Sequence, residues 1–250
     1  MAAFETITLE TAGPVATVTL QRPNALNAVT VGMLDELITA VQAVAADPAV
    51  RVLVLTGAGR AFSAGVDLKA LGDRALDGGT VGDLLDQPAR RLTALLAESS
   101  PVTIAKINGF CFTGALELAL ACDIAIAADE AVLGDTHAKW GLRPTWGMSQ
   151  RLPHAAGLPR ARYLSYTATT FTGREAADWG IVARSSPRAE LDAVVADVAE
   201  RICATSAGST TAYQDLYRAA ERLALPDGLA YEAATGYAIE DTEARIAQFR

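Results

Sequence analysis

One carboxylate stands out because it occurs in a run of small and apolar residues. Glu117 belongs to the segment 108–123, and its neighbours at helical spacing are uncharged: Thr113, Gly114, Leu120 and Ala121. No cation is therefore available for a local ion pair. Burying a carboxylate in such surroundings costs free energy unless the group is used. We interpret Glu117 as a candidate for proton transfer, with a structural hydrogen bond as the alternative.

A histidine is the second group that could move protons. His137 lies in the segment 133–141, and an imidazole takes up or releases a proton near neutral pH. Glu117 and His137 could therefore form an acid and base pair. The alternative is a hydrogen-bonded histidine of the core. Asp135 is the nearest carboxylate, but a residue two positions away cannot be assumed to point the same way. The remaining histidine, His154, is expected at the surface.

Two segments rich in small residues could bring a ligand close to the backbone. Residues 59–69 and 108–123 each follow an apolar run that is typical of a buried strand. Glycine and alanine at such positions permit close approach of a ligand to backbone N–H groups. Either segment alone could be an ordinary tight turn, so the interpretation depends on both occurring together.

The elements that must position these groups follow an α/β pattern. Apolar alternation and continuous apolar runs predict strands, while helical spacing after Thr30 predicts a helix that ends at Asp47-Pro48. The expected strands are 6–9, 15–20, 50–55, 102–107 and 124–127, with a helix over 114–122. From about residue 190 onward the pattern is helical. We therefore expect a core over residues 1–190 and a helical region over 191–250, with 73–87 as a mobile loop.

Composition excludes several classes of protein. The formal net charge is −8, and no run of Lys and Arg supplies the positive surface that nucleic acid requires. No apolar stretch reaches about 18 residues, so we expect no membrane span, and the N-terminus lacks the pattern of a secretory signal. We expect a cytoplasmic protein. Three cysteines without a CxxC pair and two histidines make disulfides and a metal site poor candidates.

Taken in order and spacing, the motifs resemble those of the enoyl-CoA hydratase (crotonase) family. Besides the two small-residue segments, the resemblance extends over Arg22-Pro23 with 24–27, Trp140-Gly141-Leu142, Gln150-Arg151-Leu152 and Phe171-Thr172-Gly173. It implies a spiral of repeated ββα turns followed by a helical C-terminal region that packs the chain into a homotrimer or a dimer of trimers. The substrate implied is an acyl-CoA thioester, with coenzyme A part of the substrate and no separate cofactor.

The resemblance also assigns roles to residues. The family's oxyanion hole falls on the backbone N–H groups of Val66 and Gly114, which would stabilise the charge that develops on the thioester oxygen. The family's first catalytic glutamate matches Glu117, but its second is replaced by His137. The expected substrate-binding residues are Ala25, Ala64, Gly65, Val66, Asp67, Leu68 and Gly114.

Three functions are compatible with this assignment. The first is hydration of a trans-2-enoyl-CoA, with Glu117 and His137 sharing the acid and base work. The second is another enolate reaction such as isomerisation of the double bond, although the family's isomerases tend to keep the second carboxylate rather than the first. The third is binding of acyl-CoA without turnover.

Overall fold

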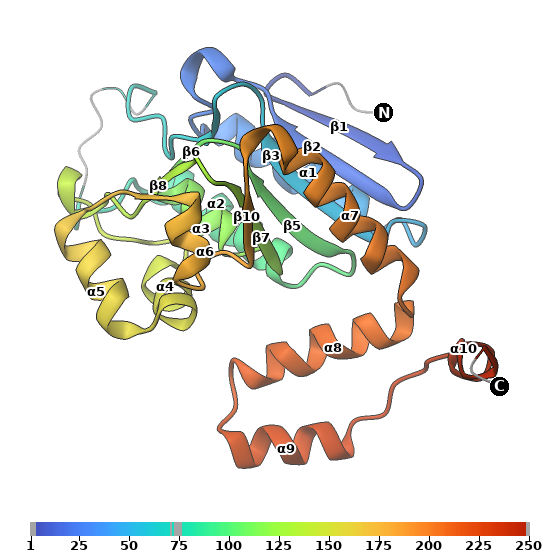
Figure 1. Ribbon diagram of the computed structural model, residues 1–250. Coiled ribbons are helices and arrows are strands. Elements are labelled where there is room, and N and C mark those ends of the chain that lie inside the picture. The colour runs from blue at the N-terminus through green and yellow to red at the C-terminus, as the bar shows by residue number, and fades with distance from the viewer. Residues whose placement is uncertain (1–3, 71, 73–76, 249–250) are drawn as a thin grey trace. The chain divides into compact units, whose positions relative to one another are not determined.

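The computed structural model describes residues 4–70, 72 and 77–248, and its core is built on a six-stranded sheet. The strands lie in the order β1-β2-β3-β5-β7-β10, with β1 antiparallel to β2 and the others parallel to their neighbours. Figure 1 shows β1, β2 and β3 side by side. The strands are β1 (Ile7–Ala12), β2 (Val15–Leu20), β3 (Val52–Gly57), β5 (Val102–Ile107), β7 (Ile124–Ala128) and β10 (Arg184–Ser186).

Burial explains why these segments form strands. All six residues of β3 are buried, as expected for a central parallel strand covered on both faces. Helix α1 (Val31–Ala45) begins where Thr30 accepts a hydrogen bond from the N–H of Met33, at 3.2 Å. Its apolar stripe is buried, so the predicted helix and the predicted central strands are confirmed within one or two residues.

A second, smaller sheet carries the functional segments. Its strands lie in the order β4-β6-β8-β9, and β4, β6 and β8 each follow a strand of the large sheet. Two or three residues are too few to show alternation, so the sequence did not predict this sheet. The small strands are β4 (Ala61–Ser63), β6 (Phe110–Phe112), β8 (Val132–Gly134) and β9 (Phe171–Thr172).

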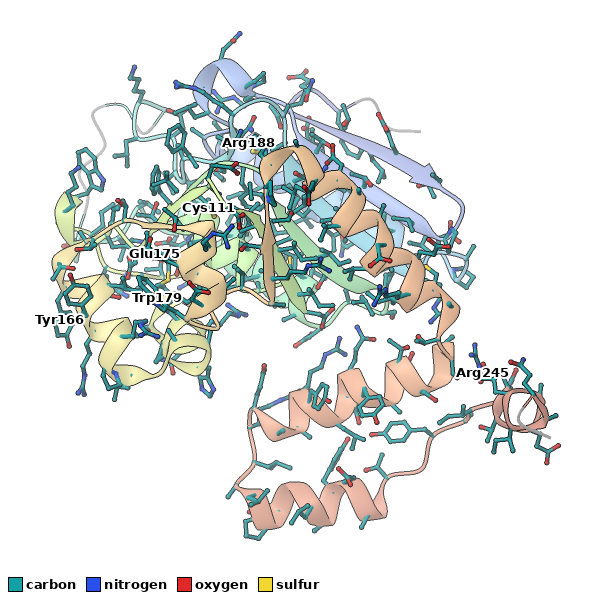
Figure 2. The ribbon with its side chains drawn as sticks, viewed as in Figure 1. Cys111, Tyr166, Glu175, Trp179, Arg188 and Arg245 are labelled. Atoms are coloured by element: carbon teal, nitrogen blue, oxygen red, sulfur yellow. The ribbon has the colours of Figure 1, made fainter. Side chains whose placement is uncertain are left out.

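Helices cover the sheets and occupy the connections. Figure 2 labels Tyr166 on α5, which is 77% exposed, and Trp179, directly after α6. The ring of Trp179 packs on Phe171 with centroids 5.5 Å apart. The helices up to residue 190 not yet described are α2 (Asp83–Ala97), α3 (Gly114–Ala119), α4 (Met148–Ala156), α5 (Leu158–Thr167) and α6 (Gly173–Asp178), with 3-10 turns η1 (Pro23–Ala25), η2 (Ala138–Trp140) and η3 (Arg188–Glu190).

The chain divides into two compact units, Met1–Asp197 and Val198–Arg250, and the division falls within α7 (Leu191–Ala204). The second unit continues with α8 (Ala207–Ala220), α9 (Leu225–Ala234) and α10 (Thr242–Ala247). Asp215 on α8 accepts hydrogen bonds from the hydroxyls of Tyr231 and Tyr237, at 2.9 and 2.6 Å. The helical character expected for the C-terminal region is confirmed.

The expected mobile loop over 73–87 is wrong at its end. Residues 73–76 lie outside the described part of the chain, but residues 83–87 form the first turns of α2. Leu85, Ala89, Leu92 and Leu96 provide a buried stripe at helical spacing, which outweighs the charges and Pro88 in this segment. The helix predicted over 114–122 is also shorter, since it ends at Ala119.

No helix within residues 4–70, 72 and 77–248 combines the length and the apolar character needed to cross a membrane.

Candidate active site

Segments that follow β4, β6 and β8 meet around one cavity of about 330 Å³. Six of the residues predicted from the sequence line it: Ala64, Val66, Leu68, Gly114, Glu117 and His137. The remaining lining residues combine apolar or aromatic side chains with polar ones such as Thr136, Lys139 and Arg143, and most of the lining surface is apolar. The apolar and aromatic ones are Val81, Phe112, Trp140, Leu142 and Trp146. A concave, largely apolar site with a few converging polar groups is typical of a small-molecule site.

Glu117 is held in a defined orientation inside α3. Its side chain is 1% exposed, and Oε1 accepts hydrogen bonds from the N–H groups of Trp146 and Met148, both at 2.9 Å. Both donors reach one oxygen because Gly147, between them, has a φ of +123°, which other residues rarely adopt. The second oxygen, Oε2, lies 3.5 Å from Nε2 of His137. The structure therefore brings together the two groups that the sequence singled out.

Burial decides the protonation behaviour of Glu117. Loss of solvation raises the pKa of its carboxyl above the usual value, and the neighbouring negative charge of Asp135 acts in the same direction. Hydrogen bonds from Met148 and Trp146 and the proximity of His137 oppose this shift without cancelling it. Glu117 can consequently hold or release a proton closer to neutral pH than an exposed glutamate can.

His137 is oriented by the carboxylate that sequence reasoning set aside. Asp135 follows β8 and points toward His137, with Oδ1 2.6 Å from Nδ1 of the ring. The other oxygen accepts a hydrogen bond from Ser165 Oγ at 2.6 Å. Although burial alone would raise it, these hydrogen bonds lower the pKa of Asp135, so the carboxylate is ionised. An ionised Asp135 accepts a hydrogen bond from Nδ1–H, and the other ring nitrogen, Nε2, faces Glu117.

Val66 and Gly114 are the residues predicted to supply backbone N–H donors. Val66 lies in a short parallel bridge with Val29, in which the neighbouring Gly65 and Asp67 make the hydrogen bonds. Within the described ranges, the N–H groups of Val66 and Gly114 have no hydrogen-bond acceptor. Both residues line the cavity.

Strain and a close contact fix the backbone at Gly114. The preceding residue, Thr113, has φ 48° and ψ −117°, a conformation that costs a non-glycine residue about 1–3 kcal/mol. Its N–H donates to Gly134 and its carbonyl accepts from Glu117, both at 3.0 Å, which holds it in place. A Cβ atom on Gly114 would come within 2.4 Å of the Trp146 ring. Glycine is thus the residue that fits at this position.

Comparison with known proteins agrees with this geometry. Residues 10–247 match the family model described as enoyl-CoA hydratase/isomerase. A probable mitochondrial enoyl-CoA hydratase of Dictyostelium discoideum is 35% identical, with 92% of this chain and 81% of that protein aligned. The chain belongs to the enoyl-CoA hydratase/isomerase (crotonase) family.

Solved structures of similar fold support the same assignment. Enoyl-CoA hydratase subunit I of Geobacillus kaustophilus HTA426 has a TM-score of 0.89 and 28% identity, with 99% of this chain and 96% of that chain covered. A putative enoyl-CoA hydratase from Thermobifida fusca YX, in complex with CoA, has a TM-score of 0.82 and 32% identity, with 98% and 94% covered. The predicted family and fold class are confirmed.

Three of the predicted substrate-binding residues are not among the cavity-lining residues. Asp67 instead pairs with Arg22, whose Nη1 and Nη2 both lie 3.0 Å from Oδ2. Gly65 donates its N–H to Ser63 Oγ at 3.1 Å, and Ala25 lies in η1. Asp67 and Gly65 thus shape the segment that carries Val66.

Sequence reasoning missed Trp146, which binds Glu117, and Asp86, which binds Trp146. The indole Nε1 of Trp146 donates to Asp86 Oδ1 at 2.8 Å, and Thr145 Oγ1 donates to the same oxygen at 2.7 Å. Asp86 is a buried carboxylate on α2. A carboxylate at a buried position of an amphipathic helix would have been the signal, but α2 itself was not predicted.

No group of three or more His, Cys, Asp or Glu side chains that could hold a metal ion occurs in the part of the chain that the structure describes. Cys111 is fully buried among the strands (Figure 2), and burial raises the pKa of its thiol well above the usual range. A buried thiol of this kind is not a nucleophile at neutral pH. Glu117 and His137 line the cavity and face one another across 3.5 Å.

Proposed function

We propose that the protein hydrates a trans-2-enoyl-CoA thioester, with Glu117 and His137 as one acid and base pair. The observation that carries the proposal is the 3.5 Å approach of Glu117 Oε2 to His137 Nε2. The cavity is also lined by Val66 and Gly114, whose N–H groups have no acceptor among the described residues. The coenzyme A bound in the Thermobifida fusca relative supports a CoA thioester as the substrate.

The two backbone donors would act on the thioester oxygen. When a nucleophile adds to the β-carbon, negative charge develops on this oxygen, and fixed N–H groups stabilise it without reorganising. Removing one donor of this type typically reduces the rate about 10²–10³-fold. The strained Thr113 and the packed Gly114 hold one of these donors rigidly, which favours this role.

Addition of water requires one proton to be taken up and another to be given. The base of the pair removes a proton from water as the oxygen bonds to the β-carbon, and the acid gives its proton to the α-carbon. In this mechanism Asp135 keeps the proton on Nδ1, and Glu117 Oε2 and His137 Nε2, which lie 3.5 Å apart, carry one further proton between them. One protonated and one unprotonated group is the state that hydration needs, and the pair returns to it after each turnover.

Asp135 serves as a positioning residue in this proposal. Its hydrogen bond to Nδ1 fixes the tautomer and the ring orientation of His137, and Ser165 fixes Asp135 in turn. A carboxylate in this position also stabilises the imidazolium form when His137 carries the shared proton. An imidazole oriented by Asp135 would thus take the place of the second glutamate of the family.

Isomerisation of the double bond is the second candidate, because the same pair could carry a proton between two carbons of the acyl chain. The two reactions differ in their products, since hydration gives a hydroxylated acyl chain and isomerisation only moves the double bond. A protein that binds acyl-CoA without turnover would give neither product.

The experiment is a panel of enoyl-CoA thioesters with product identification, alongside calorimetry with a saturated acyl-CoA. Formation of a 3-hydroxyacyl-CoA that is lost in His137→Ala supports the proposal. His154→Ala is the matched control, because His154 is exposed on α4 and does not line the cavity. A product with a shifted double bond would identify the reaction as isomerisation. Binding without any product would show that the protein does not catalyse either reaction.

The predicted homotrimer or dimer of trimers, the division at residue 190 and the cytoplasmic location stay predictions. Exposed apolar side chains on the helices of the second unit, such as Tyr213, Tyr217, Leu225 and Leu229, are compatible with an interface between copies. Light scattering of the purified protein would determine the number of subunits.

A further inference from the structure

Trp146 lies between the two features that the proposed function assigns to catalysis. Its backbone N–H binds Glu117 Oε1 at 2.9 Å, and three atoms of its ring lie 2.4–2.9 Å from where a Cβ on Gly114 would be. If the thioester oxygen binds at the Gly114 N–H and the β-carbon faces Glu117, the acyl carbons run between these two residues. The indole then flanks the acyl group directly beyond the reacting carbons.

Hydrogen bonds hold Trp146 at its ring nitrogen and at its backbone carbonyl. Nε1 donates to the buried Asp86 on α2 at 2.8 Å, and the carbonyl accepts a hydrogen bond from Arg151 Nη1 at 3.0 Å. The residue is 3% exposed, so its ring joins the start of α4 to α2 across the interior. Swinging the ring away would deprive a buried carboxylate of a donor, which is costly. Trp146 is therefore a rigid part of the cavity wall.

We infer that Trp146 is a specificity-determining residue that closes the acyl side of the cavity and restricts the protein to short acyl groups. The inference rests on the proposed function for the position of the thioester. Long chains would have to displace an indole that is held by hydrogen bonds at its ring nitrogen and at its backbone N–H and carbonyl groups.

The test measures binding, so that it does not depend on turnover. Calorimetry compares butyryl-CoA with octanoyl-CoA for the unaltered protein and for Trp146→Ala. The unaltered protein should bind octanoyl-CoA no more tightly than butyryl-CoA. In Trp146→Ala each newly buried methylene should add roughly fourfold to the affinity, so the preference should move toward octanoyl-CoA by about tenfold or more. The backbone N–H that holds Glu117 is kept in this variant.

Two further variants keep the test decisive. Trp146→Phe keeps an aromatic ring in the core and should shift the preference in the same direction by a smaller factor, which serves if Trp146→Ala does not fold in a thermal melt. Trp179→Ala removes an indole of the same size that packs on Phe171 outside the cavity lining (Figure 2), and it should leave the preference unchanged.

The inference is overturned if the unaltered protein gains affinity with each methylene, or if the folded Trp146 variants keep its preference. The protein could lack hydratase activity and still show a chain-length limit in binding that Trp146→Ala removes. This result would support the inference and refute the proposed reaction. Equal hydratase activity on short and long acyl chains would support the proposed reaction and refute the inference about Trp146.

Discussion

Replacing Asp135 by Asn tests whether His137 works as an oriented acid and base. The substitution keeps the size of the side chain and removes the charge that faces Nδ1 at 2.6 Å. An amide can accept from Nδ1–H through its oxygen or donate to Nδ1 through its nitrogen, and the second arrangement places the proton on Nε2. In the first arrangement the imidazolium form of His137 loses the charge that stabilises it. In the second, Nε2 faces Glu117 already protonated, as a donor and not as an acceptor.

The size of the effect follows from the bond that is lost. A hydrogen bond to a charged group contributes about 1.5–3 kcal/mol, which corresponds to a loss in kcat of about 10- to 150-fold if the bond acts in the transition state. Ser165→Ala removes the second hydrogen bond of Asp135 but leaves its charge. Since Ser165 is half-buried and water can replace the hydroxyl, we expect a loss of only about two- to tenfold.

The assay is hydration of a short trans-2-enoyl-CoA, followed by the loss of the conjugated double bond over a range of pH. Asp135→Asn should reduce kcat far more than it raises KM and should alter the pH–rate profile, whereas His154→Ala should do neither. If Asp135 had only a structural role, Asp135→Asn would lower the thermal melting temperature without changing the pH–rate profile. An Asp135→Asn protein with unchanged kcat and profile would refute the role assigned to the carboxylate.

Four further predictions follow from the site. Glu117→Gln should reduce turnover to a small residual rate while calorimetry with a saturated acyl-CoA shows affinity within a few fold, and a variant of equal activity would remove Glu117 from the mechanism. His137→Ala should reduce kcat by about 10²–10⁴-fold, whereas His137→Glu should keep or raise hydratase activity; full activity of the alanine variant would make His137 structural. Because the pKa of Glu117 is raised in the folded state, the unaltered protein should lose stability as pH rises from the usual pKa of a glutamate through the raised one. Denaturant unfolding should therefore show that Glu117→Gln gains stability relative to the unaltered protein over this pH range. A difference in stability that stays constant with pH would contradict the raised pKa. Gly114→Ala should place a methyl group against the Trp146 ring, cost about 1–3 kcal/mol in denaturant unfolding and lower kcat; an equally stable and active variant would refute the close contact.

The sequence predicted five of the six strands of the large sheet, because they show apolar runs or alternation, and missed β10, which has three residues, two of them serines. The strands predicted over 50–55, 102–107 and 124–127 correspond to β3, β5 and β7 within two residues. The small sheet could not be predicted in this way, since its strands owe their pairing to the ends of the large strands rather than to a pattern of their own. Helix α2 was missed because charges and Pro88 obscure its buried stripe.

The site was predicted where a signal was local and missed where it depended on tertiary contacts. Glu117 was found by its match to the first catalytic glutamate of the family, and its uncharged neighbours in the sequence supported that assignment. The bond from Trp146 to Asp86 joins residues 60 positions apart, and the bond from Trp146 to Glu117 joins residues 29 apart, so neither leaves a pattern along the chain. Asp135 is two residues from His137, yet its direction depends on how the chain turns after β8.

The central claim is that Glu117 and His137 share one proton and act as a unit. The most direct measurement is a double-mutant cycle on kcat for enoyl-CoA hydration with Glu117→Gln, His137→Ala and the combined variant. Groups that act as a unit give losses that are far from additive, so the combined variant should be about as slow as the slower single variant. Losses that multiply would show two independent contributions, and retained activity in the combined variant would show that the reaction does not use this pair.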